Sequence, residues 1–405
     1  QPIFYFMSNL DKMSPLEIRT SFILASIYAL RMLGMFLILP IFAIYASGLE
    51  GNPTSFQIGL ALGIYGLTQA LFQIPFGMSS DYFGRKKVIY FGLLLFVIGS
   101  IVAALSSTIE GIIIGRSIQG AGAISAVLTA LLADLTRDEH RTKAMAIIGG
   151  GIGLTFALSL VISPWLNALI GVDGIFLLMA ALSIVAFFII HLFIKEPANG
   201  GKKSPITKVD FLGIIKDIHL NRLNFGIFVL HATQISMFMI VPIYLIAQGG
   251  IDLNDHWYIY LPVLLVSFLL IIPVIIFSER YKKNKPSFLG AIFFLLVAQG
   301  AFIIFSSTLT GIIIALLIYF VAFNFLEASL PSFVSKVAPI NKKGLALGVY
   351  NTSQSLGIFV GGSVGGLITK LYGYNGSFLF CMMLIGLWFA FSWQMKVPEA
   401  KKKVN

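Results

Sequence analysis

The chain has few charged residues and almost no cysteine. Of its 405 residues, 11% are Asp, Glu, Lys or Arg, whereas a soluble domain carries about 25%. The single cysteine, Cys381, lies within a long apolar run, so an intrachain disulfide is excluded and neither redox chemistry nor a thiolate metal site is expected. Hydrophobic residues make up 58% of the chain. Lipid is therefore the expected solvent for most of it.

The sequence also lacks a polar stretch long enough for a separate soluble catalytic domain. Twelve crossings of about 20 residues each take roughly 240 residues and leave only short loops. The net charge of +11 would suit nucleic acid, but the lysines and arginines lie in short loops between apolar runs instead of on one polar face. Nucleic acid is not an expected partner, and the expected fold class is an all-α integral membrane protein.

Apolar runs separated by charged or Gly/Pro-containing turns predict twelve transmembrane helices. The first six cover residues 22–45, 57–79, 88–106, 111–132, 144–168 and 174–194. The second six cover residues 223–247, 257–278, 287–306, 311–334, 344–369 and 376–395. The first run is too long for a signal-peptide core and lacks a cleavage site, so we interpret it as a span. Residues 1–6 precede Met7 and are interpreted as an extension outside the fold.

Basic residues lie almost entirely on one side of these spans. The termini and the even-numbered loops hold all 28 lysines and arginines except Arg31, Arg116 and Lys370. The other side carries Lys370 and five acids, Glu50, Glu110, Asp173, Asp252 and Asp255. Because positive loops stay in the cytoplasm, both termini are predicted to be cytoplasmic. We expect a multi-pass protein of the bacterial inner membrane.

The longest loop divides the spans into two groups of six. Residues 196–221 are rich in Pro, Gly and Lys, which predicts a flexible cytoplasmic linker between an N-terminal bundle, residues 1–195, and a C-terminal bundle, residues 222–405. A weak repeat agrees, since Ser80-Asp81 follows the second span and Ser278-Glu279 follows the eighth. Two parallel six-helix halves are typical of secondary transporters with a binding site near the membrane midplane.

The loop after the second span carries a specific motif. It reads Gly77-Met-Ser-Ser-Asp81-Tyr-Phe-Gly84-Arg85-Lys86-Lys87 and resembles the signature loop of the major facilitator superfamily. Its glycines permit a tight turn and close helix approach. The resemblance implies that Asp81 meets the start of the eleventh helix near Gly344, where the helix dipole favours a negative charge. We interpret the loop as a conformational latch; the alternative is that its basic residues only set topology.

Further stretches are similar to the drug:proton antiporter group of this superfamily. Arg116-Ser-Ile-Gln119-Gly120-Ala-Gly122 resembles the second signature, whose arginine is linked to proton coupling, and the likeness covers about residues 7–398. It implies proton-coupled drug efflux by alternating access, and hence drug resistance. The fifth span departs from the antiporter pattern, because it reads Ser163-Pro164-Trp165 where that group has Gly-Pro and a glycine pair. A soluble domain that one member carries after its last helix is expected to be absent.

Four ionisable residues stand well inside the predicted spans 1, 4, 7 and 10, and such residues are functional candidates by default. They are Arg31, Arg116, His231 and Glu327. In the superfamily these four helices line the central cavity. Counting about 1.5 Å per residue places Arg31, His231 and Glu327 at one level, with Arg116 nearer the outer face. Glu327 is predicted to bind the coupling proton, modulated by Arg31 or His231. The alternatives are a permanent Glu327–Arg31 ion pair and a histidine that is only hydrogen-bonded.

Polar residues at helical spacing extend this set. Candidate substrate-cavity residues are Tyr65, Gln69, Gln73, Gln119, Gln234, Asn324, Asn351 and Gln354. In lipid such groups serve equally as hydrogen bonds between helices. Phe36, Phe72, Phe238 and Phe323 are candidates for an apolar wall. Glycines at 149–151, 153, 357, 361, 362, 365 and 366 predict close contacts of helices 5 and 11 at the seam between the halves.

These observations predict a monomeric, proton-coupled exporter of small, largely apolar or amphipathic compounds that works among membrane lipids. Protons are the expected coupling ion, and neither a metal nor a cofactor is expected. Uptake symport and lipid or lysophospholipid flipping on the same fold stay open, and a non-transporting receptor is less favoured because no output module is evident. An intramembrane enzyme would need a zinc-binding His pair or an Asp pair, which the sequence does not show.

Overall fold

The computed structural model describes residues 13–137, 140–195, 208–281, 283–339 and 342–395, and these are almost entirely helical. The first half contains α2 (Pro15–Phe36), α3 (Phe42–Ser47), α4 (Ser55–Phe83), α5 (Arg85–Ala104), α6 (Ile109–Ala121), α7 (Ser125–Asp134) and α8 (Arg141–Phe193). The second contains α9 (Lys208–Lys216), α10 (Ile218–Phe238), α11 (Val241–Ala247), the 3-10 turn η2 (Leu253–Asp255), α12 (Trp257–Arg280), α13 (Asn284–Phe305), α14 (Leu309–Val337) and α15 (Lys343–Trp393).

Ten segments of the described chain are long and apolar enough to cross a membrane. Two of them, α8 with 53 residues and α15 with 51, are more than twice as long as one crossing needs. Each is interrupted at a glycine with positive φ, 66° at Gly171 and 72° at Gly373. Glycine adopts this conformation without a Cβ clash. Each long helix therefore supplies two spans, which confirms the predicted twelve.

Breaks and caps recur at corresponding places in the two halves. The first span is split between α2 and α3 around Pro40, and the seventh between α10 and α11 just before Pro242. Both α6 and α14 begin at a threonine, Thr108 or Thr308, whose side chain accepts a hydrogen bond from the N–H three residues later. The recurrence extends the weak repeat that the sequence shows after the second and eighth spans.

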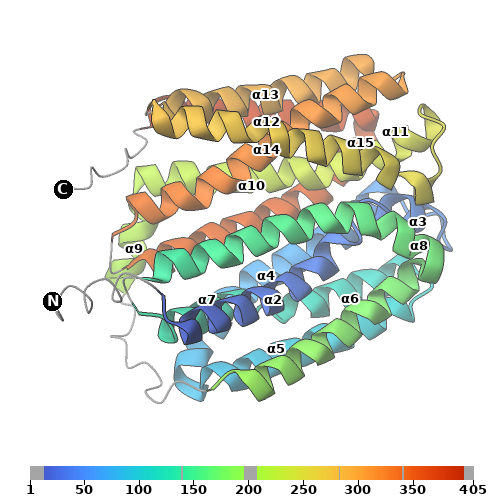
Figure 1. Ribbon diagram of the computed structural model, residues 1–405. Coiled ribbons are helices and arrows are strands. Elements are labelled where there is room, and N and C mark those ends of the chain that lie inside the picture. Colours follow the sequence, from blue (N-terminus) through green and yellow to red (C-terminus); the bar gives the residue numbers. More distant parts are fainter. Residues whose placement is uncertain (1–12, 138–139, 196–207, 282, 340–341, 396–405) are drawn as a thin grey trace.

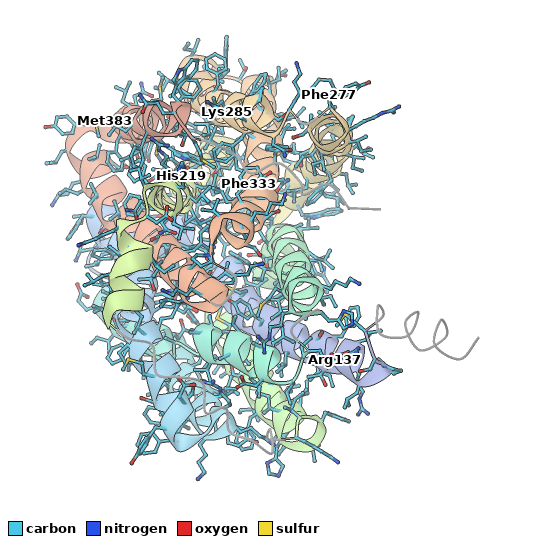
Figure 2. All side chains as sticks on the ribbon, turned by 90° about the vertical axis from the view of Figure 1, so that its left-hand side faces the viewer. Arg137, His219, Phe277, Lys285, Phe333 and Met383 are labelled. Carbon is cyan, nitrogen blue, oxygen red and sulfur yellow. The ribbon has the colours of Figure 1, made fainter. Side chains whose placement is uncertain are left out.

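The two groups of helices lie side by side, with the start of α2 and the end of α15 at the same end of the molecule (Figure 1). We call this end the terminal face and the other end the distal face. The first parts of α8 and α15 lie at the junction of the two groups. Figure 2 views the terminal face, with Phe277 and Met383 on the outer edge. Their exposed fractions of 49% and 56% fit contact with lipid.

Only part of the predicted linker lies among the described residues. Residues 196–207 and the predicted extension 1–6 lie outside them, whereas Lys208–Lys216 form α9. The predicted start of the seventh span at residue 223 is wrong, because α10 already begins at Ile218. Its N-cap is Asp217, whose carboxylate accepts from the N–H groups of His219 and Leu220. The division at residues 195 and 222 stays a prediction.

Candidate functional site

The structure brings His231 and Glu327 together, as the depth count predicts. His231 on α10 places Nε2 3.9 Å from Glu327 Oε2 on α14. On the other side, the side-chain amide nitrogen of Gln354 on α15 lies 2.8 Å from the same Nε2, and His231 Nδ1 lies 3.3 Å from the Ile227 carbonyl. A neutral imidazole with its proton on Nδ1 fits both contacts, because Nε2 then accepts from the Gln354 amide and Nδ1–H donates to the Ile227 carbonyl. Three helices of the second half meet in this polar cluster.

Glu327 keeps one carboxyl oxygen free in this cluster. Its side chain is 27% exposed, yet Oε2 is buried without a hydrogen-bond partner. Tyr319 and Tyr350 lie within electrostatic range, and the Tyr350 hydroxyl is also buried without a partner. A buried polar atom without a partner is uncommon and calls for an explanation such as a ligand or a catalytic role.

Arg31 lies in the first half and does not pair with Glu327. Its Nη1 donates to Ser125 Oγ on α7 at 2.5 Å, and its guanidinium carbon is 6.0 Å from the centre of the Tyr65 ring on α4. No described carboxylate forms an ion pair with it. In this structure the alternative of a permanent Glu327–Arg31 pair is therefore wrong. The depth count gives the level of a residue along its helix but not the direction in which it points.

Arg116 and Gln119 are bound to neighbouring helices of their own half. Arg116 donates to the carbonyl groups of Ala61 and Leu62 on α4 at 3.2 and 3.3 Å, and to Gln119 Oε1 at 3.4 Å. Gln119 in turn donates to Ser100 Oγ on α5 at 2.8 Å. This geometry joins α6 to α4 and α5, so both side chains act here as links between helices.

The remaining cavity candidates fall into two groups. Gln69 and Gln234 are buried with an amide oxygen that has no partner, and the Tyr65 hydroxyl is in the same situation. Asn324 instead donates to Ser267 Oγ on α12 at 3.1 Å, which is a link within the second half. Asn351 is partly buried, and its backbone carbonyl accepts from the Ser355 hydroxyl.

Gln73 is the candidate that reaches across the two halves. Its side-chain amide lies 3.5 Å from the Gly348 carbonyl on α15, and its amide oxygen is buried without a partner. The contact is long for a hydrogen bond. The two halves are therefore only loosely joined at this level.

An aromatic cluster lies on the distal side of the polar cluster. Phe156 on α8, which the sequence analysis missed, has ring centroids 5.1 Å from Phe36, 5.5 Å from Phe323 and 6.4 Å from Phe238. Along α10 and α14, Phe238 and Phe323 lie closer to the distal face than His231 and Glu327. The fourth predicted wall residue, Phe72, is 42% exposed and pairs with Phe76 instead.

Helix α15 joins the two halves through glycines. On one face, Gly357, Gly361 and Gly365 pack against α10; on another, Gly362 and Gly366 pack against α4. Across that second contact, a Cβ on Gly63 of α4 would lie 2.8 Å from the Phe359 carbonyl oxygen. The predicted role of helix 11 at the seam is confirmed. The predicted close packing of helix 5 through its glycines is wrong, since a Cβ on Gly149, Gly150 or Gly153 would meet nothing within 4 Å. Helix 5 nevertheless lies at the seam, where Phe156 and Asn167 contact the second half.

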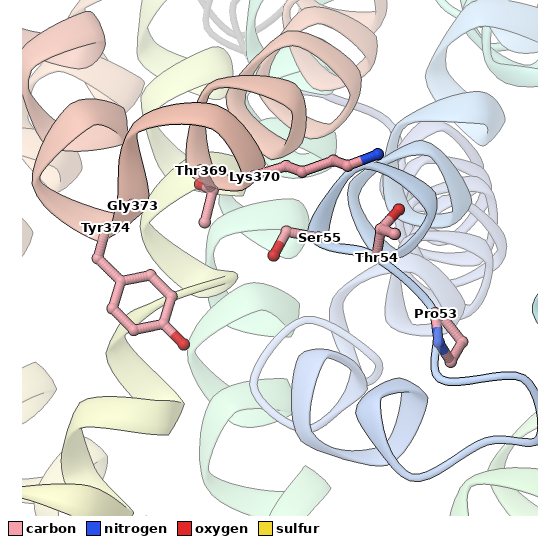
Figure 3. A pocket seen from close by; sticks show the side chains of 7 residues that line it. All are labelled: Pro53, Thr54, Ser55, Thr369, Lys370, Gly373 and Tyr374. Atoms are coloured by element: carbon pink, nitrogen blue, oxygen red, sulfur yellow. The ribbon is translucent and has the colours of Figure 1, made fainter.

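Contact between the halves is closer toward the distal face. Gly366 approaches the start of α4 so closely that a Cβ would lie 2.5 Å from the Ser55 carbonyl oxygen, whereas Gly344 and Gly348 near the terminal face have no such neighbour. Asn167 of the first half also donates to Asn254 of the second at 3.1 Å near the distal face. Figure 3 shows the pocket at this end of the seam, with Lys370 extending toward the start of α4.

The motif loop forms its charged network within the first half. Gly84 joins α4 to α5 with φ 95°, a conformation that favours glycine. Buried Arg85 bonds to Asp81 at 2.5 Å, Asp134 at 2.9 Å and Ser80 at 2.6 Å. Lys86 donates to the Ile194 carbonyl at the end of α8 at 2.8 Å, where a cation complements the helix dipole.

The expected contact of Asp81 with the eleventh helix is not formed in the described part of the chain. Asp81 is 53% exposed, and no hydrogen bond or ion pair joins it to α15. The loose packing near the terminal face accounts for this. Gly77 is also not needed for close packing here, because its Cβ would lie 3.8 Å from Ala126. The latch stays a prediction about another conformation.

A second buried ion pair on the terminal face was not predicted. Glu17 at the start of α2 accepts from the Arg137 side chain at 2.9 and 3.0 Å and from the Arg137 N–H at 2.9 Å. The Ser14 N–H donates to the same carboxylate at 2.8 Å, completing a capping box. The sequence Ser-Pro-Leu-Glu is typical of a capping box at the start of a helix, but it does not show that Arg137 pairs with Glu17.

Comparison with known proteins agrees with this architecture. The family model described as Major Facilitator Superfamily matches residues 24–362. The chain is 41% identical to the inner membrane transport protein YajR of Escherichia coli K12, over 96% of this chain and 85% of that protein. It is 26% identical to multidrug resistance protein 2 of Bacillus subtilis 168, over 91% and 93% of the two chains. A solved bacterial homologue of the human lysosomal transporter Spinster, inward-facing and occupied, matches with a TM-score of 0.76 at 14% identity, over 94% and 97%. The chain therefore belongs to the Major Facilitator Superfamily, whose members are membrane transporters and not enzymes.

Proposed function

We propose that this transporter exports small, largely apolar or amphipathic compounds in exchange for protons, across the cytoplasmic membrane of a bacterium. The observation that carries the proposal is Glu327, a carboxyl group inside a span, with one buried oxygen that has no hydrogen-bond partner and with His231 beside it. Ionisable groups inside membrane spans mark proton and substrate pathways in transporters. Competition of proton and substrate for this cluster gives exchange.

The packing of the halves supplies the alternating access. The aromatic cluster and the glycine contacts hold the distal side closed, while Glu327 lies on the terminal side of that closure. Opening of the distal side requires α4 and α15 to separate. Both halves of the site come from one chain, which supports a monomer as the working unit and needs no cofactor.

The names of similar proteins support the proposed direction of transport. Multidrug resistance protein 2 resembles the chain over nearly its full length, and YajR is named as an inner membrane protein. The first name supports export from the cytoplasm, and the second supports a place in the inner membrane. Uptake by symport and lipid flipping are the rival functions, and each predicts a different result in vesicles.

A pH-gradient flux assay in proteoliposomes tests the proposal. The full chain is reconstituted, and a panel of cationic, neutral and anionic amphipathic compounds is offered with and without an imposed gradient. We expect the gradient to drive accumulation of at least one compound in vesicles with an acidic interior, and that compound to elicit proton movement. Symport would need the opposite gradient, and flipping would move lipid without one.

Two variants complete the assay. Glu327→Gln is expected to abolish the gradient-driven accumulation, whereas Glu50→Gln, at an exposed acid on the distal face, is expected to keep it. Monodisperse elution of both variants checks folding. Proton coupling that persists in Glu327→Gln contradicts the proposal, as does a wild-type protein that moves no compound under any gradient.

A further inference from the structure

The first half holds a buried guanidinium group whose donors are only partly used. Arg31 is 3% exposed, and of its three nitrogens only Nη1 has a hydrogen-bond partner, the Ser125 hydroxyl. Nε and Nη2 are both buried with no partner. A guanidinium carries five N–H donors in a planar fork, so the unused side presents a geometry that matches a carboxylate or another oxyanion.

A second buried donor without a partner lies beside it. The Tyr65 ring is 6.0 Å from the Arg31 guanidinium carbon, and the Tyr65 hydroxyl is buried with no partner. Arg116, which packs over the same ring at 5.1 Å, differs because its Nε, Nη1 and Nη2 all donate to oxygen atoms. Of the two arginines that pack on the Tyr65 ring, only Arg31 has donors without a partner.

A charge in this position is costly unless something pairs with it. Removing a charged group from water without a partner costs several kcal/mol. Natural proteins therefore pair such groups with an opposite charge or place them where they bind a substrate or an ion. No described carboxylate pairs with Arg31, and Glu327 instead approaches His231 in the other half. A bound anion would supply the missing partner.

We propose that Arg31 binds the negatively charged group of the transported compound, so that amphipathic organic anions are substrates. The inference rests on the proposed function, because it names the substrate class of the same exporter. The carboxylate or sulfonate of the compound accepts from Arg31 Nε and Nη2 and from the Tyr65 hydroxyl. Phe36 lies on the same helix as Arg31 and packs against Phe156. The aromatic cluster around Phe156 binds the apolar part of the compound.

Binding to the purified full chain in nanodiscs tests the inference with three matched probes. They are radiolabelled 4-phenylbutyrate, the neutral 4-phenylbutyramide and the cationic 4-phenylbutylamine. Because hydrogen bonds to charged groups are the stronger kind, we expect the carboxylate to bind about tenfold more tightly than the amide. Equal affinity for the carboxylate and the amide overturns the inference.

The variants separate a binding role from a structural one. Arg31→Gln is expected to bring the carboxylate-to-amide ratio of affinities close to one, and Arg31→Lys to give an intermediate ratio because it keeps the charge but loses the fork. The matched control is Arg280→Gln, an exposed arginine that also lies over a tyrosine ring, at 5.9 Å, and it should keep the wild-type ratio. If Arg31→Gln does not fold, the Lys variant decides, and a wild-type ratio in it contradicts the inference.

The flux assay distinguishes failure of this inference from failure of the proposed function. Gradient-driven transport of the amide or the amine, with no Arg31-dependent preference for the carboxylate, overturns the substrate class and leaves proton-coupled export standing. Arg31-dependent binding of the carboxylate, with no compound driven by any gradient, supports the anion site and overturns the export proposal.

Discussion

Single residues explain why the candidate site was only partly predictable. Apolar runs interrupted by one charge identify Arg31, His231 and Glu327, because charged groups inside lipid are rare and costly. Counting along the helices also predicts that Arg31, His231 and Glu327 lie at one level, and the structure places His231 3.9 Å from Glu327. The count says nothing about helix rotation, so it missed Ser125 as the partner of Arg31 and Gln354 as the partner of His231.

Gln354→Leu tests the role of the amide that holds the His231 ring. Leucine has similar bulk but cannot donate to Nε2, so the imidazole loses the bond that fixes its orientation beside Glu327. We expect proton-coupled transport to slow about three- to tenfold, the equivalent of one neutral hydrogen bond. The rate under a pH gradient measures this, and Gln354→Asn, which keeps an amide donor on a shorter side chain, is the comparison. A wild-type rate in Gln354→Leu contradicts a positioning role.

Glu17→Gln tests the buried ion pair on the terminal face. The Glu17 carboxylate is 7% exposed and accepts from Arg137, whose side chain is 41% exposed. We expect a loss of about 1–2 kcal/mol in the free energy of unfolding, below the 3–5 kcal/mol of a fully buried pair because water screens Arg137. Thermal unfolding in detergent measures it, with exposed Glu50→Gln as the control. Equal unfolding temperatures of Glu17→Gln and wild type would mean that the pair contributes nothing.

At the scale of helices, glycine patterns predicted close packing in one case and failed in the other. Helix α15 uses its glycines to approach both α10 and α4, whereas Gly149 and Gly150 in α8 are exposed and meet no neighbour. A run of glycines permits close approach but does not require it, and only the arrangement of helices decides which face is used. The partner glycines on α4, Gly59 and Gly63, were not predicted for the same reason.

Gly362→Ala tests the seam between the halves. Its methyl group would overlap the Gly59 carbonyl oxygen on α4, so the two helices must separate. We expect the conformational equilibrium to move toward opening of the distal face, seen as longer spin-label distances between Asn52→Cys and Lys370→Cys. Gly149→Ala meets nothing within 4 Å and should leave the distances unchanged. Unchanged distances in Gly362→Ala contradict a seam that controls access.

For the whole molecule, hydropathy and loop charge were sufficient to predict the fold class. Both follow from bilayer thickness and from the retention of positive loops in the cytoplasm, which apply to every span. The turns at Gly171 and Gly373 fell between predicted spans, although the helices continue on both sides of them. The sequence could not predict which side of the transporter is closed in this structure, because all conformations of a transporter share one pattern of apolar residues.

Cysteine labelling tests the twelve-span topology. In a Cys381→Ser background, Tyr372→Cys lies beside the Gly373 break, where the tyrosine is 74% exposed, and Lys283→Cys lies in the loop between α12 and α13. We expect an impermeant maleimide to label position 372 from outside intact cells and position 283 only after permeabilisation. Labelling of both positions from the same side would contradict the topology.

The central claim is that Glu327 exchanges a proton for substrate, and counterflow in proteoliposomes tests it most directly. The compound that wild-type protein accumulates fastest is loaded inside, and the labelled compound is offered outside without a pH gradient. Glutamine can neither take up nor release a proton, so Glu327→Gln loses the coupling step, whereas exchange of substrate for substrate needs no proton. We predict that this variant exchanges substrate at close to the wild-type rate while failing to accumulate it under a pH gradient. Accumulation by Glu327→Gln at the wild-type level would contradict the account.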